Sequence, residues 1–107
     1  MKKTPYDQNT LTDLTPDQVE DFKKEYGEVF CIEVEDKKCF IHKPTRQILD
    51  LASASSTKKS SAFNETILKN CWLAGDKDIV SNDDYFMGAG NVLDEIITFK
   101  SAELKKL

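Results

Sequence analysis

The chain has 107 residues, a length that suits one domain with a single modest core. Fifteen basic and nineteen acidic residues give a net charge of −4, mixed along the chain without a basic stripe, which argues against duplex nucleic acid as a partner. No apolar run is long enough to span a membrane, and none follows the lysines near the N-terminus, so we expect neither a membrane span nor a secretory signal. Three cysteines, an odd number, then favour reduced thiols and a cytoplasmic location.

The first regular element is expected after a polar, unpatterned stretch. Residues 1–13 predict a flexible N-terminal arm. A helix should begin directly after Thr15, because Pro16 suits the first helical position and Gln18 completes a capping box with Thr15. Gly27 is the expected end of this helix.

A β-hairpin follows. Residues 30–35 alternate between apolar and polar side chains, as a half-buried strand does. Asp36 and Lys37 form the expected turn, residues 38–42 return as the second strand, and Pro44 ends it. A lone two-stranded hairpin is marginally stable in water, so a helix or another chain should cover it. We therefore expect a homo-oligomer that associates through the edge of the hairpin.

The widest apolar face of the chain lies in residues 62–76, which we expect to form the central helix. Thr45 can cap a helix before it, and the small polar residues 53–61 predict a flexible connection between the two. After it, residues 76–84 predict an acidic loop. The last helix should begin at Asp83 or the residue after it, with an apolar face that ends near residue 99.

The expected fold class is therefore α+β. A short β-hairpin packs with three or four helices, the C-terminal two thirds of the chain are predominantly helical, and residues 14–107 form a single domain.

Two cysteine-based sites can be drawn from the sequence. Cys39-x-x-His42, with Cys31 and Cys71 elsewhere, offers ligand types that zinc prefers, but the second close pair of a zinc finger is missing, and residues 39 and 42 point to opposite faces of a strand. A cysteine paired with the sole histidine could be a nucleophile, but nothing marks an orienting group. Buried, inert thiols and a surface histidine are the simpler interpretation. We expect no catalytic residue and no enzyme activity.

Charged clusters give two further candidates. The acidic side chains that could hold a divalent cation are Asp76, Asp78, Asp83 and Asp84. Their spacing lacks the glycine of a calcium loop, and helix capping explains them. The doublets Lys58–Lys59 and Lys105–Lys106 could contact RNA or an acidic partner, although solvated ends are the simpler interpretation. We expect no metal and no cofactor.

The order of parts carries a family resemblance. A charged strand pair ends at Lys43-Pro44, a helix and a variable polar connection follow, and the next helix holds Asn70-Cys71-Trp72 with Gly75-Asp76 before an acidic step and a closing helix. Over about residues 28–107, this order resembles that of the small tail-assembly chaperones of tailed bacteriophages and of related prophage-encoded hypothetical proteins.

The resemblance implies a non-enzymatic role in the host cytoplasm. Such proteins bind the helical, aggregation-prone tape-measure protein and bring tail-tube subunits to it during virion assembly. The mobile serine-rich segment beside the apolar central helix could open a groove in which an amphipathic helix of that partner would lie. The candidate partner-binding residues are Phe63, Ile67, Trp72, Ile96, Ile97 and Phe99. Packing in the core is the competing interpretation for each of them. For the protein as a whole, the alternative is a small regulatory protein that binds nucleic acid or a host protein.

Overall fold

The computed structural model describes residues 11–97 and 102–107. In chain order the elements are α1 (Pro16–Tyr26), β1 (Val29–Val34), β2 (Lys37–His42), α2 (Arg46–Ser55), α3 (Ala62–Cys71), β3 (Trp72–Gly75), α4 (Asp78–Ser81) and α5 (Asp83–Ile96). The α+β fold class is confirmed, with one strand more than the predicted hairpin. Most of the predicted N-terminal arm, residues 1–10, lies outside the described part, as does Phe99. Within that part, no helix combines the length and the apolar character that crossing a membrane requires.

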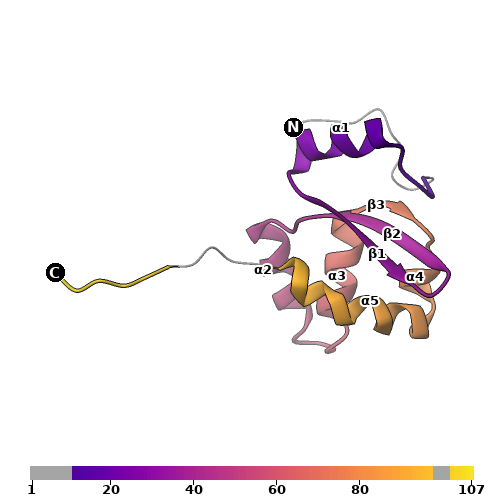
Figure 1. Cartoon of the computed structure of the whole chain (residues 1–107). Helices are drawn as coiled ribbons and strands as arrows, with labels where there is room; N and C mark the ends of the chain where they lie inside the picture. Colours follow the sequence, from indigo (N-terminus) through magenta and orange to yellow (C-terminus); the bar gives the residue numbers. More distant parts are fainter. Residues whose placement is uncertain (1–10, 98–101) are drawn as a thin grey trace.

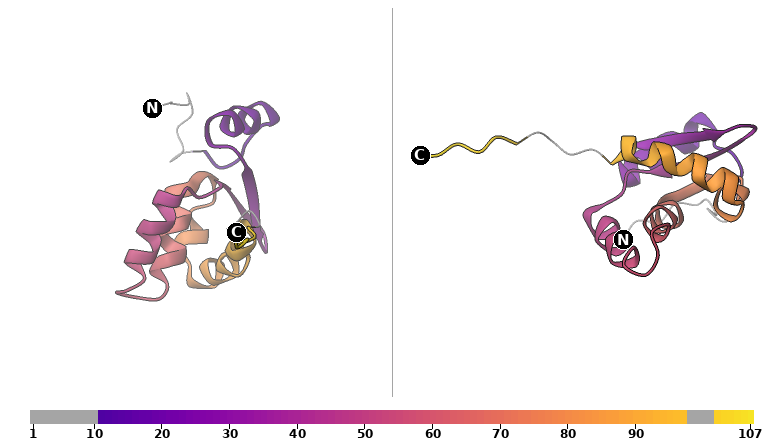
Figure 2. Two further views of the ribbon diagram at one scale, coloured as in Figure 1. Left: turned by 90° about the vertical axis from the view of Figure 1, so that its left-hand side faces the viewer. Right: turned by 90° about the horizontal axis from the view of Figure 1, so that it is seen from below.

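The sheet lies between two layers of helices (Figure 1). α1 packs on one face of the β1–β2 hairpin, while α3, α4 and α5 pack on the other side, as the two turned views of Figure 2 also show. The main core forms on the α3 and α5 side, around the fully buried side chains of Ile41, Ile67 and Leu93. Phe22 of α1 is also fully buried and lies outside this cluster, on the α1 side of the sheet.

The third strand corrects the prediction of a single helix over residues 62–76. The helix ends at Cys71, and Trp72 turns into extended backbone with φ −62° and ψ 130°. β3 then pairs antiparallel with β2, with Gly75 opposite Cys39. All four β3 residues are buried, so this apolar stretch suits a fully covered strand as well as a helix face. The cover that the hairpin needs thus comes partly from its own chain.

Capping side chains begin α1, α2 and α5 where the sequence predicted these helices. The Thr15 hydroxyl accepts from the Gln18 amide at 3.2 Å, and the Gln18 side chain accepts from the Thr15 amide at 2.9 Å, which completes the capping box. The Thr45 hydroxyl caps α2 by accepting from the Ile48 amide at 3.2 Å, without the reciprocal bond of a capping box. The last helix begins at Asp83, as predicted, after Asn82, whose side chain accepts from the amide of Asp84 at 3.0 Å.

Two connections are more ordered than expected. α2 continues to Ser55, so the helix takes up the first part of the serine-rich segment 53–61. Ser55 donates its hydroxyl to the Leu51 carbonyl at 3.0 Å, which satisfies the hydroxyl within the helix. The predicted acidic loop contains the single turn of α4. The hairpin turn falls at residues 35–36, one position earlier than predicted, and Glu35 adopts φ 55° there.

Candidate functional site

The structure separates the predicted partner-binding residues. Ile67, Trp72 and Ile96 lie in the core, with exposed fractions of 0%, 8% and 6%. Phe63 and Ile97 are half-buried, and the sixth residue lies outside the described part. Phe63 packs against this core from its edge. Four of the six predicted residues therefore belong to the core of the folded chain rather than to an open groove.

The outer edge of β1 is the backbone surface best suited to receive another segment. The strand order is β1-β2-β3, so β1 and β3 are the two edges of the sheet. The edge at β3 is partly occupied, since the Gly75 amide donates to the Leu11 carbonyl at 2.9 Å. Within residues 11–97 and 102–107, no backbone hydrogen bond beyond the pairing with β2 reaches β1. Unpaired amide and carbonyl groups on such an edge are a template for an added strand.

A groove of about 380 Å³ lies between this edge and α5. Its walls are residues 30–33 of β1 and the side chains of Val92, Glu95 and Ile96 on α5. Earlier in the helix, α5 lies close against the end of β1, since a Cβ on Gly88 would stand 2.9 Å from a methyl carbon of Val34. A glycine at this position therefore lets the helix approach the strand.

The chemistry of the groove is apolar inside and acidic at the rim. Phe30 and Val92 are half-buried and offer apolar contact area, while Glu33 and Glu95 are exposed. Cys31 is also exposed as a residue, but partial desolvation of its thiol and the nearby charge of Glu33 raise the pKa of this thiol. An extended segment with apolar and basic side chains would match both features while its backbone paired with β1.

These residues were only partly visible in the sequence. The hairpin edge was expected as a contact surface, and Ile96 was among the predicted residues. The role of Glu33, Val92 and Glu95 was missed, because only the packing of α5 beside β1 places them around one groove.

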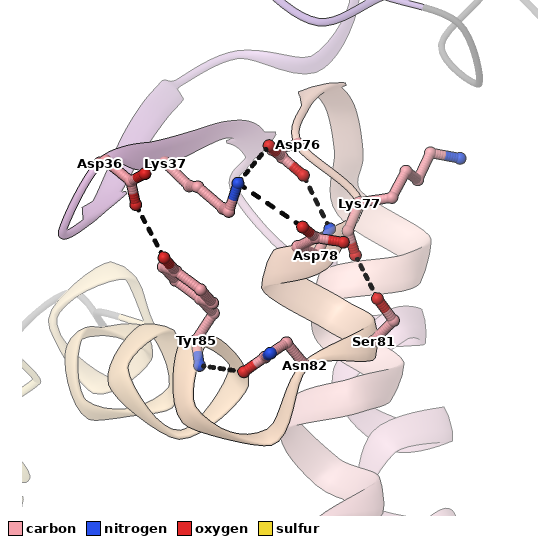
Figure 3. A network of polar contacts seen from close by, with 8 residues as sticks. All are labelled: Asp36, Lys37, Asp76, Lys77, Asp78, Ser81, Asn82 and Tyr85. Atoms are coloured by element: carbon pink, nitrogen blue, oxygen red, sulfur yellow. Dashed lines mark hydrogen bonds and ion pairs between the residues drawn. The ribbon is translucent and has the colours of Figure 1, made fainter.

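The predicted acidic cluster forms a different structure, shown in Figure 3. Lys37 reaches from β2 to the carboxylates of Asp76, at 3.2 Å, and Asp78, at 3.5 Å. The pKa of Asp76 is lowered by the backbone N–H of residue 78, which donates to this carboxylate, and by Lys37. The Tyr85 hydroxyl donates to Asp36 at 2.7 Å, so the network ties the hairpin turn to α4 and α5. Among the described residues, no group of three or more histidine, cysteine, aspartate or glutamate side chains is placed to hold a metal ion.

The cysteines and the histidine do not form a joint site. Cys39 and Cys71 are buried in the main core, and desolvation raises the pKa of each thiol to about 12. His42 is 4% exposed rather than on the surface as predicted, and it stacks on Tyr26 of α1. The expectation that residues 39 and 42 lie on opposite faces of β2 is thus confirmed.

Comparisons of the chain with protein-family models, with curated proteins and with solved structures find no match.

Proposed function

We propose that this protein is a non-enzymatic adaptor or assembly chaperone, of the kind used in the tail assembly of phages and prophages, and that it holds a segment of a partner protein beside β1. The observation that carries the proposal is the β1 edge, which has no further backbone partner among the described residues, next to a groove lined by apolar and acidic side chains. Backbone pairing along β1 gives affinity that does not depend on sequence, and the groove selects the side chains.

The geometry favours an extended partner segment over a helix. The helix faces that a partner helix would need are closed by Ile67, Trp72 and Ile96 within the chain itself. An aggregation-prone protein exposes extended segments before it assembles, and pairing such a segment at one protected edge keeps it from pairing with other copies. By resemblance, the partner is a tape-measure-like or tail-tube-like protein.

Co-expression with a tape-measure-like protein from the same genome tests the proposal. We expect the wild-type chain to raise the soluble fraction of this partner, and the double variant Glu33→Lys/Glu95→Lys to lose most of that effect, because both charges stand at the groove rim. Glu20→Lys/Asp50→Lys is the matched control, since both residues are exposed on α1 and α2 and the net charge changes equally.

Two results would contradict the proposal in different ways. If the wild-type chain leaves the partner insoluble, the chaperone role is wrong. If the wild-type chain and the Glu33→Lys/Glu95→Lys variant protect the partner equally, the role stands, but the groove beside β1 is not the binding site.

A further inference from the structure

The residues after α5 carry the most exposed leucines of the described chain. Leu104 is 98% exposed and Leu107 is fully exposed. Residues 102–107 form neither helix nor strand, and Figures 1 and 2 show them extending away from the domain. Full burial of a leucine side chain is worth about 1.5–3 kcal/mol, so two bare leucines in one short segment favour a covered state.

The charges of this segment complement those of the groove. Lys105 and Lys106 are exposed, and the Lys105 ammonium lies 3.8 Å from the carboxylate of Glu103, which is the acidic side chain of the segment. Glu33 and Glu95 stand at the rim of the groove, also exposed. Opposite charges at a binding surface fix orientation and register.

In an extended conformation paired with β1, residues 102–107 would present alternate side chains to the two faces of the sheet. Successive side chains of a strand point to opposite faces, so Leu104 and Lys106 share one face. With this face turned to α5, Leu104 would lie at the apolar groove wall and Lys106 near Glu95. Lys105 would then face the other side of the sheet together with Leu107, where Glu33 lies across from Lys38 of β2.

We infer that residues 102–107 of a second copy fill the groove beside β1, so that the protein is a dimer in which each copy places this segment in the other. Among the described residues, the groove is lined only by β1 and α5, while residues 102–107 extend away from the domain (Figure 2). If each copy places its segment in the groove of the other, both grooves are filled in a dimer with twofold symmetry. Twofold symmetry is the commonest symmetry of protein dimers. The inference rests on the proposed function only in that the groove accepts an extended segment. A partner segment would then displace the second copy.

A charge-exchange experiment tests this arrangement. One variant carries Glu33→Lys/Glu95→Lys and the other Lys105→Glu/Lys106→Glu. In each variant alone, groove and segment have like charges, and we expect the dimer dissociation constant, measured by sedimentation equilibrium, to rise by about tenfold or more. In an equal mixture, each segment meets a groove of opposite charge, so the mixed dimer should recover the wild-type affinity.

A second pair of variants separates the segment from general surface effects. Leu104→Asp should abolish the dimer, because Leu104 is the leucine that enters the groove, while Leu51→Asp should leave it intact, because Leu51 is 50% exposed on α2 and lies outside the groove lining. Circular dichroism checks that every variant is folded.

The inference is overturned by a monomeric wild type, by single variants that dimerise as well as the wild type, or by a mixture that gains no affinity. These results are independent of the co-expression assay. If the variants dimerise as expected but the tape-measure-like partner stays insoluble in co-expression, only the proposed function is overturned. If the partner becomes soluble but the wild-type protein is a monomer, only the reciprocal dimer is overturned.

Discussion

The ring of Tyr26 on α1 stacks on the ring of His42 at the end of β2, with centroids 4.2 Å apart and an angle of 4° between the planes. Nδ1 of His42 lies 2.9 Å from the backbone carbonyl oxygen of Lys43 and donates to it. This stack joins α1 to the sheet on the face opposite the main core. It explains why a lone histidine in a charged chain is buried rather than on the surface.

Acidification should weaken the fold through His42. Burial lowers the pKa of this side chain below its usual 6.5, although hydrogen bonds to the carbonyls of Lys43 and Asn70 oppose the shift. The unfolded chain therefore binds the proton more readily, and stability present above pH 6.5 is lost as the pH falls toward the lower folded pKa. Urea unfolding between pH 8 and about pH 5 should show this loss.

His42→Phe is the control for this window, since it keeps an aromatic ring against Tyr26 but removes the proton. Its stability should change little between pH 8 and about pH 5. The carboxyl groups of Asp36 and Asp76 have lowered pKa values and titrate below this range. An equal slope in both proteins would show that another group causes the pH dependence.

Gly75 should be far less tolerant of a side chain than Gly27. Gly75 has φ +138°, and a Cβ there would stand 2.4 Å from the Cα of Cys39, so Gly75→Ala must separate β3 from β2. Gly27 has φ +89° with no atom within 4 Å, so Gly27→Ala adds only backbone strain. We expect losses of about 3 kcal/mol or more for the first and about 1–2 kcal/mol for the second in denaturant unfolding. Equal losses of unfolding free energy in the two variants would mean that the close contact between Gly75 and Cys39 adds no cost beyond backbone strain.

Local chemistry made much of the fold predictable. The caps at Thr15 and Thr45 and the alternation over residues 30–35 are short-range signals, and the structure follows them. β3 was missed because Trp72–Gly75 continues an apolar helix face without interruption. What ends the helix is pairing with β2, a contact between residues more than thirty positions apart, as with Gly75 and Cys39.

The candidate site was less predictable because it joins distant segments. By intrinsic propensity alone, Gly88 and Gly90 weaken the last helix. In the structure, a Cβ on Gly88 would stand 2.9 Å from Val34, and one on Gly90 would stand 2.8 Å from the side-chain amide of Asn64. These two glycines thus let α5 approach β1 and α3, and that approach positions the groove. No local pattern shows which neighbour a helix glycine will meet.

Truncation of Ile67 tests whether the central helix face is core or contact surface. Ile67 is fully buried, so Ile67→Ala should cost about 2–5 kcal/mol of unfolding free energy. Leu51→Ala should change it by no more than about 0.5 kcal/mol, because this leucine is half exposed. The emission of Trp72, the single tryptophan, reports unfolding. Similar small losses for both variants would place the α3 face outside the core.

Thiol titration should separate the three cysteines by burial. In the folded protein at pH 8, we expect a disulfide reagent to label Cys31 alone, and slowly, because its pKa is raised. Cys39 and Cys71 are buried with pKa values of about 12, so they should react only after unfolding in guanidinium. Cys31→Ser should then abolish labelling of the native protein. Rapid labelling of two or three thiols without denaturant would contradict the burial of Cys39 in β2 and of Cys71 at the end of α3.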